Sequence, residues 1–347
     1  MLALRAYQVA DARGLIKLDA MENPYPLPEV VRKAWAQRLA AVAVNRYPDP
    51  EAAALKAALR SAMDLPLGAS LMLGNGSDEL LQILISAVAR PGATLVTPAP
   101  GFAMFGLIAR AAGLRHETVD LTPEFALDAD AMRAAIDAHR PALVIVAQPN
   151  NPTGNAFDAA ALRAVVEAAP GLVVIDEAYY PFADADCRAW LDDYPHLLLL
   201  RTVSKLGLAG LRLGLLAGAP RWIEALEPLR LPYNINALTQ AGAEVALSHY
   251  DAFAAQAAAI VAERRRLHEA LAALPGLTVH PSQANFLLVR VPAGRAPALH
   301  AGLRDAGILV KLVDGSHPLV ADCLRITVGS PEGNTAVITA LGDLLGA

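Results

Sequence analysis

The sequence predicts an α/β fold, in which a large domain with a mainly parallel sheet between two helix layers precedes a smaller α+β domain. The first observation is a set of short apolar runs without alternation, at 142–147, 172–175 and 197–200. Such runs are typical of strands buried on both faces of a parallel sheet. The second is the helical pattern between them, as at 158–169, because strand–helix alternation favours helices on both sides of a sheet. The third is the length of 347 residues, which suits two cores.

The chain begins with a segment, residues 1–28, whose prolines and polar residues favour an extended arm rather than a core element. This arm is expected to pack with the small domain or with a partner subunit. After the arm, residues 78–89 are predicted to form a helix with one apolar face. Residues 94–97 are predicted to form a short strand, which Pro98 and Pro100 are expected to end.

The large domain is expected over 29–245 and the small domain over 246–347. After a turn at 232–236, a long helix is predicted at about 251–274, and a helix of this length often bridges domains. The rest of the small domain is expected to contain strands at 285–291, 308–312 and 324–328, a helix at 296–306 and a closing helix.

Composition argues against several classes of function. Hydrophobic residues make up 55% and charged residues 18%, which predicts a large buried core. The net charge is −5 without a basic stripe, so no nucleic-acid partner is expected. No apolar run reaches the roughly 18 residues of a membrane span, and residues 1–14 lack a secretory signal, so we expect a cytoplasmic protein with no membrane partner. Cys187, Cys323 and the histidines show no metal-ligand spacing, so no metal is expected.

Two polar residues follow predicted strands, at the sheet edge where open α/β folds bind ligands. Asp176 follows the run 172–175 and Lys205 follows the run 197–200. Taken singly, Asp176 is more often an ion-pair partner or helix cap, and Lys205 a solvated surface residue. Together they are the pair that pyridoxal phosphate requires, because a lysine forms a Schiff base and moves protons while a carboxylate keeps the pyridine nitrogen protonated.

Three further segments offer contacts for such a cofactor. Residues 74–79 (GNGSDE) open a helix, where free N–H groups bind phosphate, although these residues fit a simple helix cap equally well. Residues 148–154 (QPNNPTG) form a turn in which Asn151 is a candidate donor to the pyridine O3′. Arg212 alone suggests a surface residue, but its guanidinium also suits a phosphate clamp.

A series of motifs runs in order along nearly the whole chain. It comprises LDAMENP at 18–24, NRYPDP at 45–50, GNGSDE at 74–79, NNPTG at 150–154, DEAY at 176–179, SK at 204–205, LAGLR at 208–212, ANF at 284–286 and CLRITVG at 323–329. This series resembles fold-type-I, pyridoxal-phosphate-dependent aminotransferases of the histidinol-phosphate aminotransferase family. NRYPDP and the closing LRITVG point to that family among its relatives.

The resemblance implies a role for each matching position and a homodimer with a shared active site. Lys205 is expected to be the Schiff-base lysine, Asp176 the partner of the pyridinium nitrogen, and Asn151 and Tyr179 partners of O3′. The remaining implied contacts are Ser77, Asp78, Ser204 and Arg212 with the cofactor phosphate, Tyr47 with the phosphate of the neighbouring subunit, Phe105 stacked on the ring, and Asn23, Lys311 and Arg325 with the substrate.

The chain departs from the family pattern in several places. Phe105 stands where Tyr is common, and the nearby Phe102 leaves open which ring stacks on the cofactor. The segment 205–212 is one residue shorter than is usual. Met21 replaces a common Asn. Lys311 replaces a common Arg and offers a point charge instead of a fork, so the substrate phosphate is expected to bind differently.

The resemblance implies that an amino group is exchanged between L-histidinol phosphate and 2-oxoglutarate in histidine biosynthesis. Aromatic amino-acid aminotransferases and threonine-phosphate decarboxylases share the cofactor motifs, so only substrate-facing residues separate these alternatives. A non-catalytic regulatory protein on the same fold is disfavoured because Lys205 and Asp176 are both retained and no basic recognition helix is found. A dinucleotide-dependent dehydrogenase is disfavoured because residues 74–79 do not match Gly-x-Gly-x-x-Gly.

Overall fold

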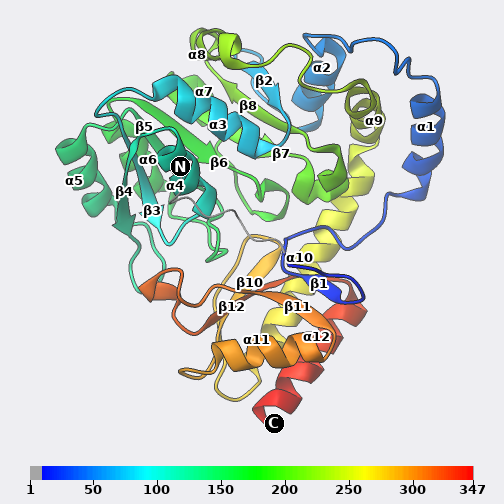
Figure 1. The fold of residues 1–347 in the computed structure, drawn as a ribbon, viewed down its shortest axis with the longest axis vertical. Helices are drawn as coiled ribbons and strands as arrows, with labels where there is room; N and C mark the ends of the chain where they lie inside the picture. Colours follow the sequence, from blue (N-terminus) through cyan, green and yellow to red (C-terminus); the bar gives the residue numbers. More distant parts are fainter. Residues whose placement is uncertain (1–9, 347) are drawn as a thin grey trace.

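The computed structural model describes residues 10–346 and contains two sheets (Figure 1). The larger sheet has seven strands in the order β2-β8-β7-β6-β5-β3-β4. Their bounds are β2 Ser70–Gly74, β3 Thr94–Ala99, β4 Arg115–Asp120, β5 Leu143–Ala147, β6 Leu172–Asp176, β7 Leu197–Thr202 and β8 Gly214–Gly218. β8 runs antiparallel to β2 and β7, and the other neighbours pair in parallel, so the sheet is mainly parallel as predicted.

Residues of the central strands alternate between two apolar clusters, one on each face of this sheet. On β6, Val173 and Ile175 belong to one cluster, and Leu172 and Val174 to the other. The first cluster includes residues of α1 Glu29–Ala40, α2 Ala53–Ala62, α5 Ala129–His139, α6 Ala159–Ala168, α7 Trp190–Asp193 and α9 Ala237–Leu247; the second includes residues of α3 Ser77–Val88, α4 Ala103–Ala111 and α8 Pro220–Leu226. Because helices cover both faces, these strands need apolar residues at every position.

The smaller sheet has five strands in the order β1-β11-β12-β10-β9. Their bounds are β1 Ile16–Leu18, β9 Thr278–Val279, β10 Phe286–Arg290, β11 Ile308–Leu312 and β12 Cys323–Thr327. Helices α10 Tyr250–Ala272, α11 Ala296–Asp305 and α12 Pro331–Leu345 pack with it around a third cluster. Figure 1 shows α10 running from the large sheet to the small one, and its Phe253 lies in a cluster of the former while its Leu267 lies in that of the latter.

The arm contributes a short strand that was not predicted, and the prediction that Pro98 ends a strand was wrong. Residues 1–9 of the arm lie outside the described residues. In the part that is described, Ile16–Leu18 pairs in parallel with β11 and Leu18 is buried, so the arm packs with the small sheet. Pro98 does not end its strand, which continues to Ala99. Pairing of β3 with β5 stops at Val96, so beyond that point β3 pairs with β4 on one side, where a missing N–H is tolerated.

The domain boundaries at residues 28 and 245 stay predictions, and the second would fall within α9. Within residues 10–346, no single helix is long and apolar enough to cross a membrane. The bent pair of α9 and α10, with an angle of 76° between them, meets the length and composition criteria only jointly.

Candidate active site

Side chains that follow β5, β6 and β7 meet at the carboxyl edge of the large sheet. Asn151 follows β5, Asp176 ends β6 and Lys205 follows β7. With the start of α3 they enclose a cavity of about 110 Å³. The lining residues are Met21, Ser77, Asp78, Phe102, Ala147, Asn151, Asp176, Ala178, Tyr179, Thr202, Ser204, Lys205 and Arg212. The structure thus brings together most of the residues that the sequence predicted for a cofactor site.

Asp176 lies deep in this cavity, with 5% of its surface exposed. Its Oδ1 accepts a hydrogen bond from the Ala178 N–H at 3.0 Å. Burial raises the pKa of Asp176 to about 7, and the nearby carboxylates of Asp78 and Glu177 add to the rise. A cationic ring nitrogen beside Asp176 would supply the missing counter-charge, so the carboxylate is suited to hold such a group.

Lys205 lies in the turn Ser204–Leu208 and points toward the same cavity. Its Nζ donates a hydrogen bond to the Ala20 carbonyl at 3.2 Å. Burial, followed by the positive charge of Arg325, lowers the pKa of Lys205 to about 8. An amine with this pKa loses its proton close to neutral pH, which suits a nucleophile and a proton carrier.

Asn151 is held by residues from both sheets. Its Nδ2 donates a hydrogen bond to the hydroxyl of Tyr179 at 3.0 Å. Its Oδ1 accepts one from Nη1 of Arg325, on β12, at 2.6 Å. Nη2 of Arg325 donates to the Asp19 carbonyl at 2.8 Å. Arg325 therefore ties the floor of the cavity to the arm and to the small sheet.

The start of α3 forms a cradle that fits a phosphate. The first N–H groups of a helix lack partners within it, and within residues 10–346 no side chain accepts from the N–H of Ser77 or Asp78. A Cβ at Gly76 would lie 2.7 Å from Nη2 of Arg212, so only glycine admits the guanidinium so close. Nη1 of Arg212 donates to Oγ of Ser204 at 3.5 Å. Backbone N–H groups, a hydroxyl and a guanidinium are the donors that phosphate prefers.

Phe102, and not Phe105, lies on the wall of the cavity, which favours the second of the two predicted alternatives for the stacking ring. Phe105 is 2% exposed and packs in the apolar cluster between α3, α4 and the sheet. Phe102 lines the cavity instead, and its ring meets that of Phe105 edge-on at 5.4 Å. The reason is that α4 begins at Ala103, so Phe102 has an extended backbone before the helix while Phe105 faces inward from its first turn.

Tyr47 and Asn23 do not line the cavity. Tyr47 is 81% exposed, and its ring stacks on that of Tyr233 with 4.5 Å between the centroids. Nδ2 of Asn23 donates to the Leu206 carbonyl at 3.0 Å and lies 3.1 Å from Oε1 of Gln256. Asn23 therefore holds the turn that follows Lys205, and its predicted contact with the substrate stays a prediction.

Lys311 lies in a second hollow, of about 400 Å³, which adjoins the first through Met21. Lys311 and Arg325 are directly opposite each other on the antiparallel strands β11 and β12. Opposite residues of such a pair project to the same face of a sheet. Both line this hollow, so its wall carries two adjacent cations.

Besides Phe102, four lining residues were not among the predicted contacts: Met21, Ala147, Ala178 and Thr202. Oγ1 of Thr202 lies 2.9 Å from Oγ of Ser204. Thr202 ends a mostly apolar strand, and no motif in the sequence distinguishes it from an ordinary strand residue. Met21 separates the two hollows, and the arm is fixed there because the Met21 N–H donates to Oγ1 of Thr327 while Nδ2 of Asn285 donates to the Met21 carbonyl. The only signal in the sequence was that Met21 departs from the family pattern.

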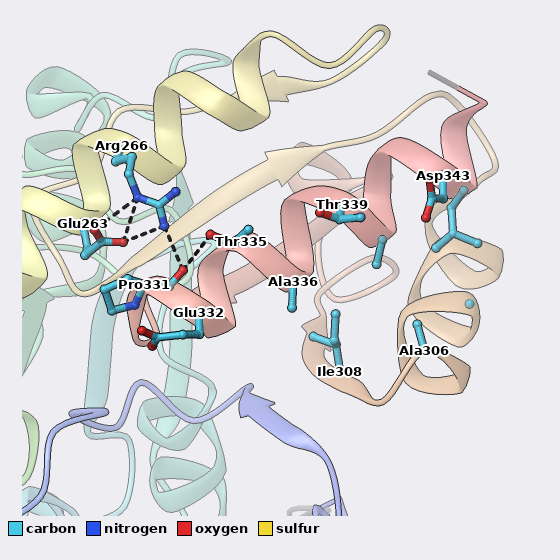
Figure 2. A pocket seen from close by; sticks show the side chains of 13 residues that line it. Glu263, Arg266, Ala306, Ile308, Pro331, Glu332, Thr335, Ala336, Thr339 and Asp343 are labelled. Carbon is cyan, nitrogen blue, oxygen red and sulfur yellow. Dashed lines mark hydrogen bonds and ion pairs between the residues drawn. The ribbon is translucent and has the colours of Figure 1, made fainter.

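A larger open groove, of about 1030 Å³, lies between α10, α11 and α12 (Figure 2). Arg266 on its rim pairs with Glu263 at 2.9 Å and donates to the Pro331 carbonyl at 3.0 Å. Its charged groups are exposed or paired with each other, whereas the smaller cavity combines a buried carboxylate with a buried amine. The cavity at Lys205 is therefore the candidate active site.

Comparison with known proteins agrees with this geometry. The family described as aminotransferase class I and II matches residues 13–341. Histidinol-phosphate aminotransferase 1 of Ralstonia nicotianae is 52% identical, with 99% of this chain and 92% of that protein covered. The enzyme of that name from Chromobacterium violaceum is 51% identical, with 98% and 95% covered.

Solved structures show the same fold. Histidinol-phosphate aminotransferase from Sinorhizobium meliloti, determined in complex with pyridoxal-5′-phosphate, has a TM-score of 0.88 at 27% identity, with 98% of this chain and 96% of that chain covered. The Clostridium acetobutylicum enzyme also has a TM-score of 0.88, at 21% identity with 96% and 99% covered, and shows the fold alone. By family match and by identity over nearly its whole length, this chain belongs to the class I and II aminotransferases and, within them, to the histidinol-phosphate aminotransferase family.

Proposed function

We propose that this protein uses pyridoxal phosphate to transfer the amino group between L-histidinol phosphate and 2-oxoglutarate, in the cytoplasm and in histidine biosynthesis. The observation that carries the proposal is the meeting of Lys205 and Asp176 in one buried cavity beside an uncapped helix start. Near-50% identity to histidinol-phosphate aminotransferases over the whole chain supports the choice of substrate.

Each side of the cavity serves one part of the cofactor. When bound, pyridoxal phosphate supplies an electron-poor ring that stabilises negative charge at the substrate Cα. Asp176 would hold the protonated ring nitrogen, and Asn151 with Tyr179 would donate to the ring oxygen. Phe102 would cover one ring face. Lys205 would supply the amine that holds the cofactor aldehyde when no substrate is present.

Proton transfer would be the task of Lys205 once the substrate amine has displaced it. Its lowered pKa leaves a neutral amine available close to neutral pH, so Nζ can take the proton that leaves the substrate Cα. The hydrogen bond to the Ala20 carbonyl keeps Nζ in the cavity. The same amine would then deliver that proton to C4′ of the cofactor rather than back to Cα, as transfer of the amino group requires.

Two anion sites would be needed, one for each phosphate. The cradle of Ser77, Asp78, Ser204 and Arg212 would hold the cofactor phosphate. Arg325 and Lys311 would face the substrate, because they line the adjoining hollow from opposite positions on β11 and β12. The guanidinium of Arg325 suits both the phosphate of one substrate and the carboxylate of the other, since it binds either anion with two N–H groups.

A homodimer would complete the site. Tyr47 is exposed and lies outside its own cavity, and we propose that it reaches the cofactor phosphate of the partner subunit. Large apolar side chains near it in sequence or space are exposed as well: Val44 is 73% exposed, Leu231 72% and Tyr233 40%. Exposed apolar residues beside an aromatic stack favour a protein interface.

The visible absorption spectrum of the purified protein tests this function. Wild type loaded with the cofactor should show the visible absorption band of a Schiff base between lysine and pyridoxal phosphate, and Lys205→Ala should lack this band. When no keto acid is present, L-histidinol phosphate should convert this band to that of the pyridoxamine form of the cofactor. The conversion should be faster than with L-phenylalanine or O-phospho-L-threonine. Faster conversion by L-phenylalanine would keep the aminotransferase chemistry and overturn the substrate. Failure of wild type to bind the cofactor would overturn the whole proposal.

A further inference from the structure

Glu79 carries a carboxylate that the proposed mechanism does not use. It lies in the first turn of α3, and its Oε2 accepts a hydrogen bond from the Asn75 N–H at 2.7 Å. The same oxygen accepts one from Nδ2 of Asn234 at 3.0 Å. Nδ2 of Asn75 lies 3.3 Å from both oxygens. Within residues 10–346 the hydrogen-bond partners of Glu79 are thus neutral amides, so it serves as an acceptor rather than half of an ion pair.

These contacts fix the loop that precedes the phosphate cradle. The Gly76 N–H donates to the Gly74 carbonyl at 2.8 Å, and the Asn75 N–H is taken by Glu79. The next N–H groups along the chain, those of Ser77 and Asp78, are the ones left for an anion. A Cβ at Gly74 would come within 3.2 Å of Oε2 of Glu79, so the loop is also fitted closely around this carboxylate.

The hydrogen bond between Glu79 and Asn234 connects the cradle to the segment that carries Tyr233, whose ring stacks on Tyr47. Nδ2 of Asn75 donates to the Asn234 carbonyl at 2.9 Å, and Nδ2 of Asn234 also donates to the Leu73 carbonyl at 3.0 Å. The residue before Asn234 is Tyr233, whose φ of 60° lies in the left-handed region. One carboxylate therefore braces both the cradle and the loop behind Tyr47.

We propose that Glu79 is a positioning residue for the cofactor phosphate: it holds the loop 74–76 so that the N–H groups of Ser77 and Asp78 point into the cavity, and it steadies the Tyr233 loop. The inference rests on the proposed function, because it assumes that the ligand of the cradle is the phosphate of pyridoxal phosphate. It differs from a role in folding alone, since loss of Glu79 should weaken recognition of the phosphate and not of the ring.

The experiment compares two probes, pyridoxal 5′-phosphate and pyridoxal, which lacks the phosphate. Dissociation constants are measured by absorbance titration of cofactor-free wild type, Glu79→Ala and Glu79→Gln. Asp130→Ala is the matched control, because it removes an exposed first-turn carboxylate from α5, away from the cavity. Melting temperatures of all variants show whether they fold.

Glu79→Ala should weaken pyridoxal 5′-phosphate binding on the order of tenfold or more, as expected for a lost hydrogen bond to a charged group. Pyridoxal binding should change little. Glu79→Gln should recover part of the affinity, because one oxygen still accepts from Asn75, and Asp130→Ala should match wild type. If Glu79→Ala loses affinity equally for both probes, or loses none, the inference is overturned. The proposed function still stands in that case, provided that wild type binds pyridoxal 5′-phosphate. Wild type that prefers neither probe would overturn both.

Discussion

Burial shifts the two ionisable groups at the centre of the site in opposite directions. The pKa of the Asp176 carboxyl rises to about 7, and that of the Lys205 amine falls to about 8. Both shifts arise because burial disfavours the charged form, so the two groups lower the free energy of unfolding of the cofactor-free protein. A ring cation beside Asp176 and a covalent bond at Lys205 would each remove one of these penalties, which explains why a binding site is built around groups that destabilise it when empty.

Replacement of Lys205 by Met should stabilise the cofactor-free protein at pH 7. The folded-state pKa of Lys205 lies below its unfolded value of about 10.4, so its charged form is disfavoured in the fold. The cost is fully present below about pH 8 and disappears as the pH rises toward 10.4. The gain should be on the order of 3 kcal/mol at pH 7 and vanish near pH 10. Denaturant unfolding at both pH values measures it, and a variant less stable at pH 7 would contradict the shift.

Alanine substitutions of Phe102 and Phe105 should affect cofactor binding and folding stability differently. Phe105→Ala leaves a cavity in the cluster under α4 and should cost about 3–5 kcal/mol of unfolding free energy. Phe102→Ala should cost much less, because that ring is only partly buried and lines the cavity, but it should weaken cofactor binding. Chemical unfolding and cofactor titration of both variants test whether Phe102 is the ring that contacts the cofactor. A larger loss of cofactor affinity in Phe105→Ala than in Phe102→Ala would contradict this.

Among the strands, those that contain a continuous apolar run were mostly predictable, in the small sheet as well as the large one, whereas β4 and β8 were not. β5 is apolar throughout and β6 and β7 each begin with four apolar residues, and the sequence indicated each strand within about two residues. β4 was missed because it is an edge strand whose residues, Arg115 to Asp120, are mostly polar. β8 was missed because it begins and ends with glycine. A Cβ at Gly214 would lie 2.6 Å from the Gly76 carbonyl carbon, so its composition follows from contact with the phosphate loop.

The cross-strand pair on β11 and β12 should set affinity for the phosphorylated substrate. Lys311→Ala should raise KM for L-histidinol phosphate roughly tenfold, since a charge-assisted contact is lost, with a smaller change in kcat. Lys311→Arg should keep or improve the affinity, because a guanidinium binds phosphate with two N–H groups. Lys17→Ala is the control, because Lys17 lines the same hollow from β1 and is not part of the cross-strand pair of Lys311 and Arg325. An equal rise in KM for Lys17→Ala would show that only the total charge of the hollow matters.

At the scale of the whole molecule, the proposed dimer makes cofactor binding depend on assembly. Leu231→Asp places a charge among the exposed apolar residues near the Tyr47–Tyr233 stack and should yield monomers with lower cofactor occupancy. Tyr47→Phe should leave the dimer intact and weaken cofactor binding modestly, because only the hydroxyl is lost. Light scattering reports the mass, and absorbance reports occupancy. A Leu231→Asp protein that remains dimeric would place the interface elsewhere.

The sequence by itself determined the fold class, the cofactor and the residues that meet at the carboxyl edge of the sheet. It could do so because buried parallel strands require continuous apolar runs, and because polar residues directly after such strands must converge at one edge. Only the tertiary structure decided that Phe102 rather than Phe105 faces the cavity, that Asn23 holds the turn after Lys205, and that β1 joins the small sheet. Each of these depends on where a helix begins or on contacts between distant segments, such as Ile16 with Ile308, and neither leaves a periodic signal in the chain.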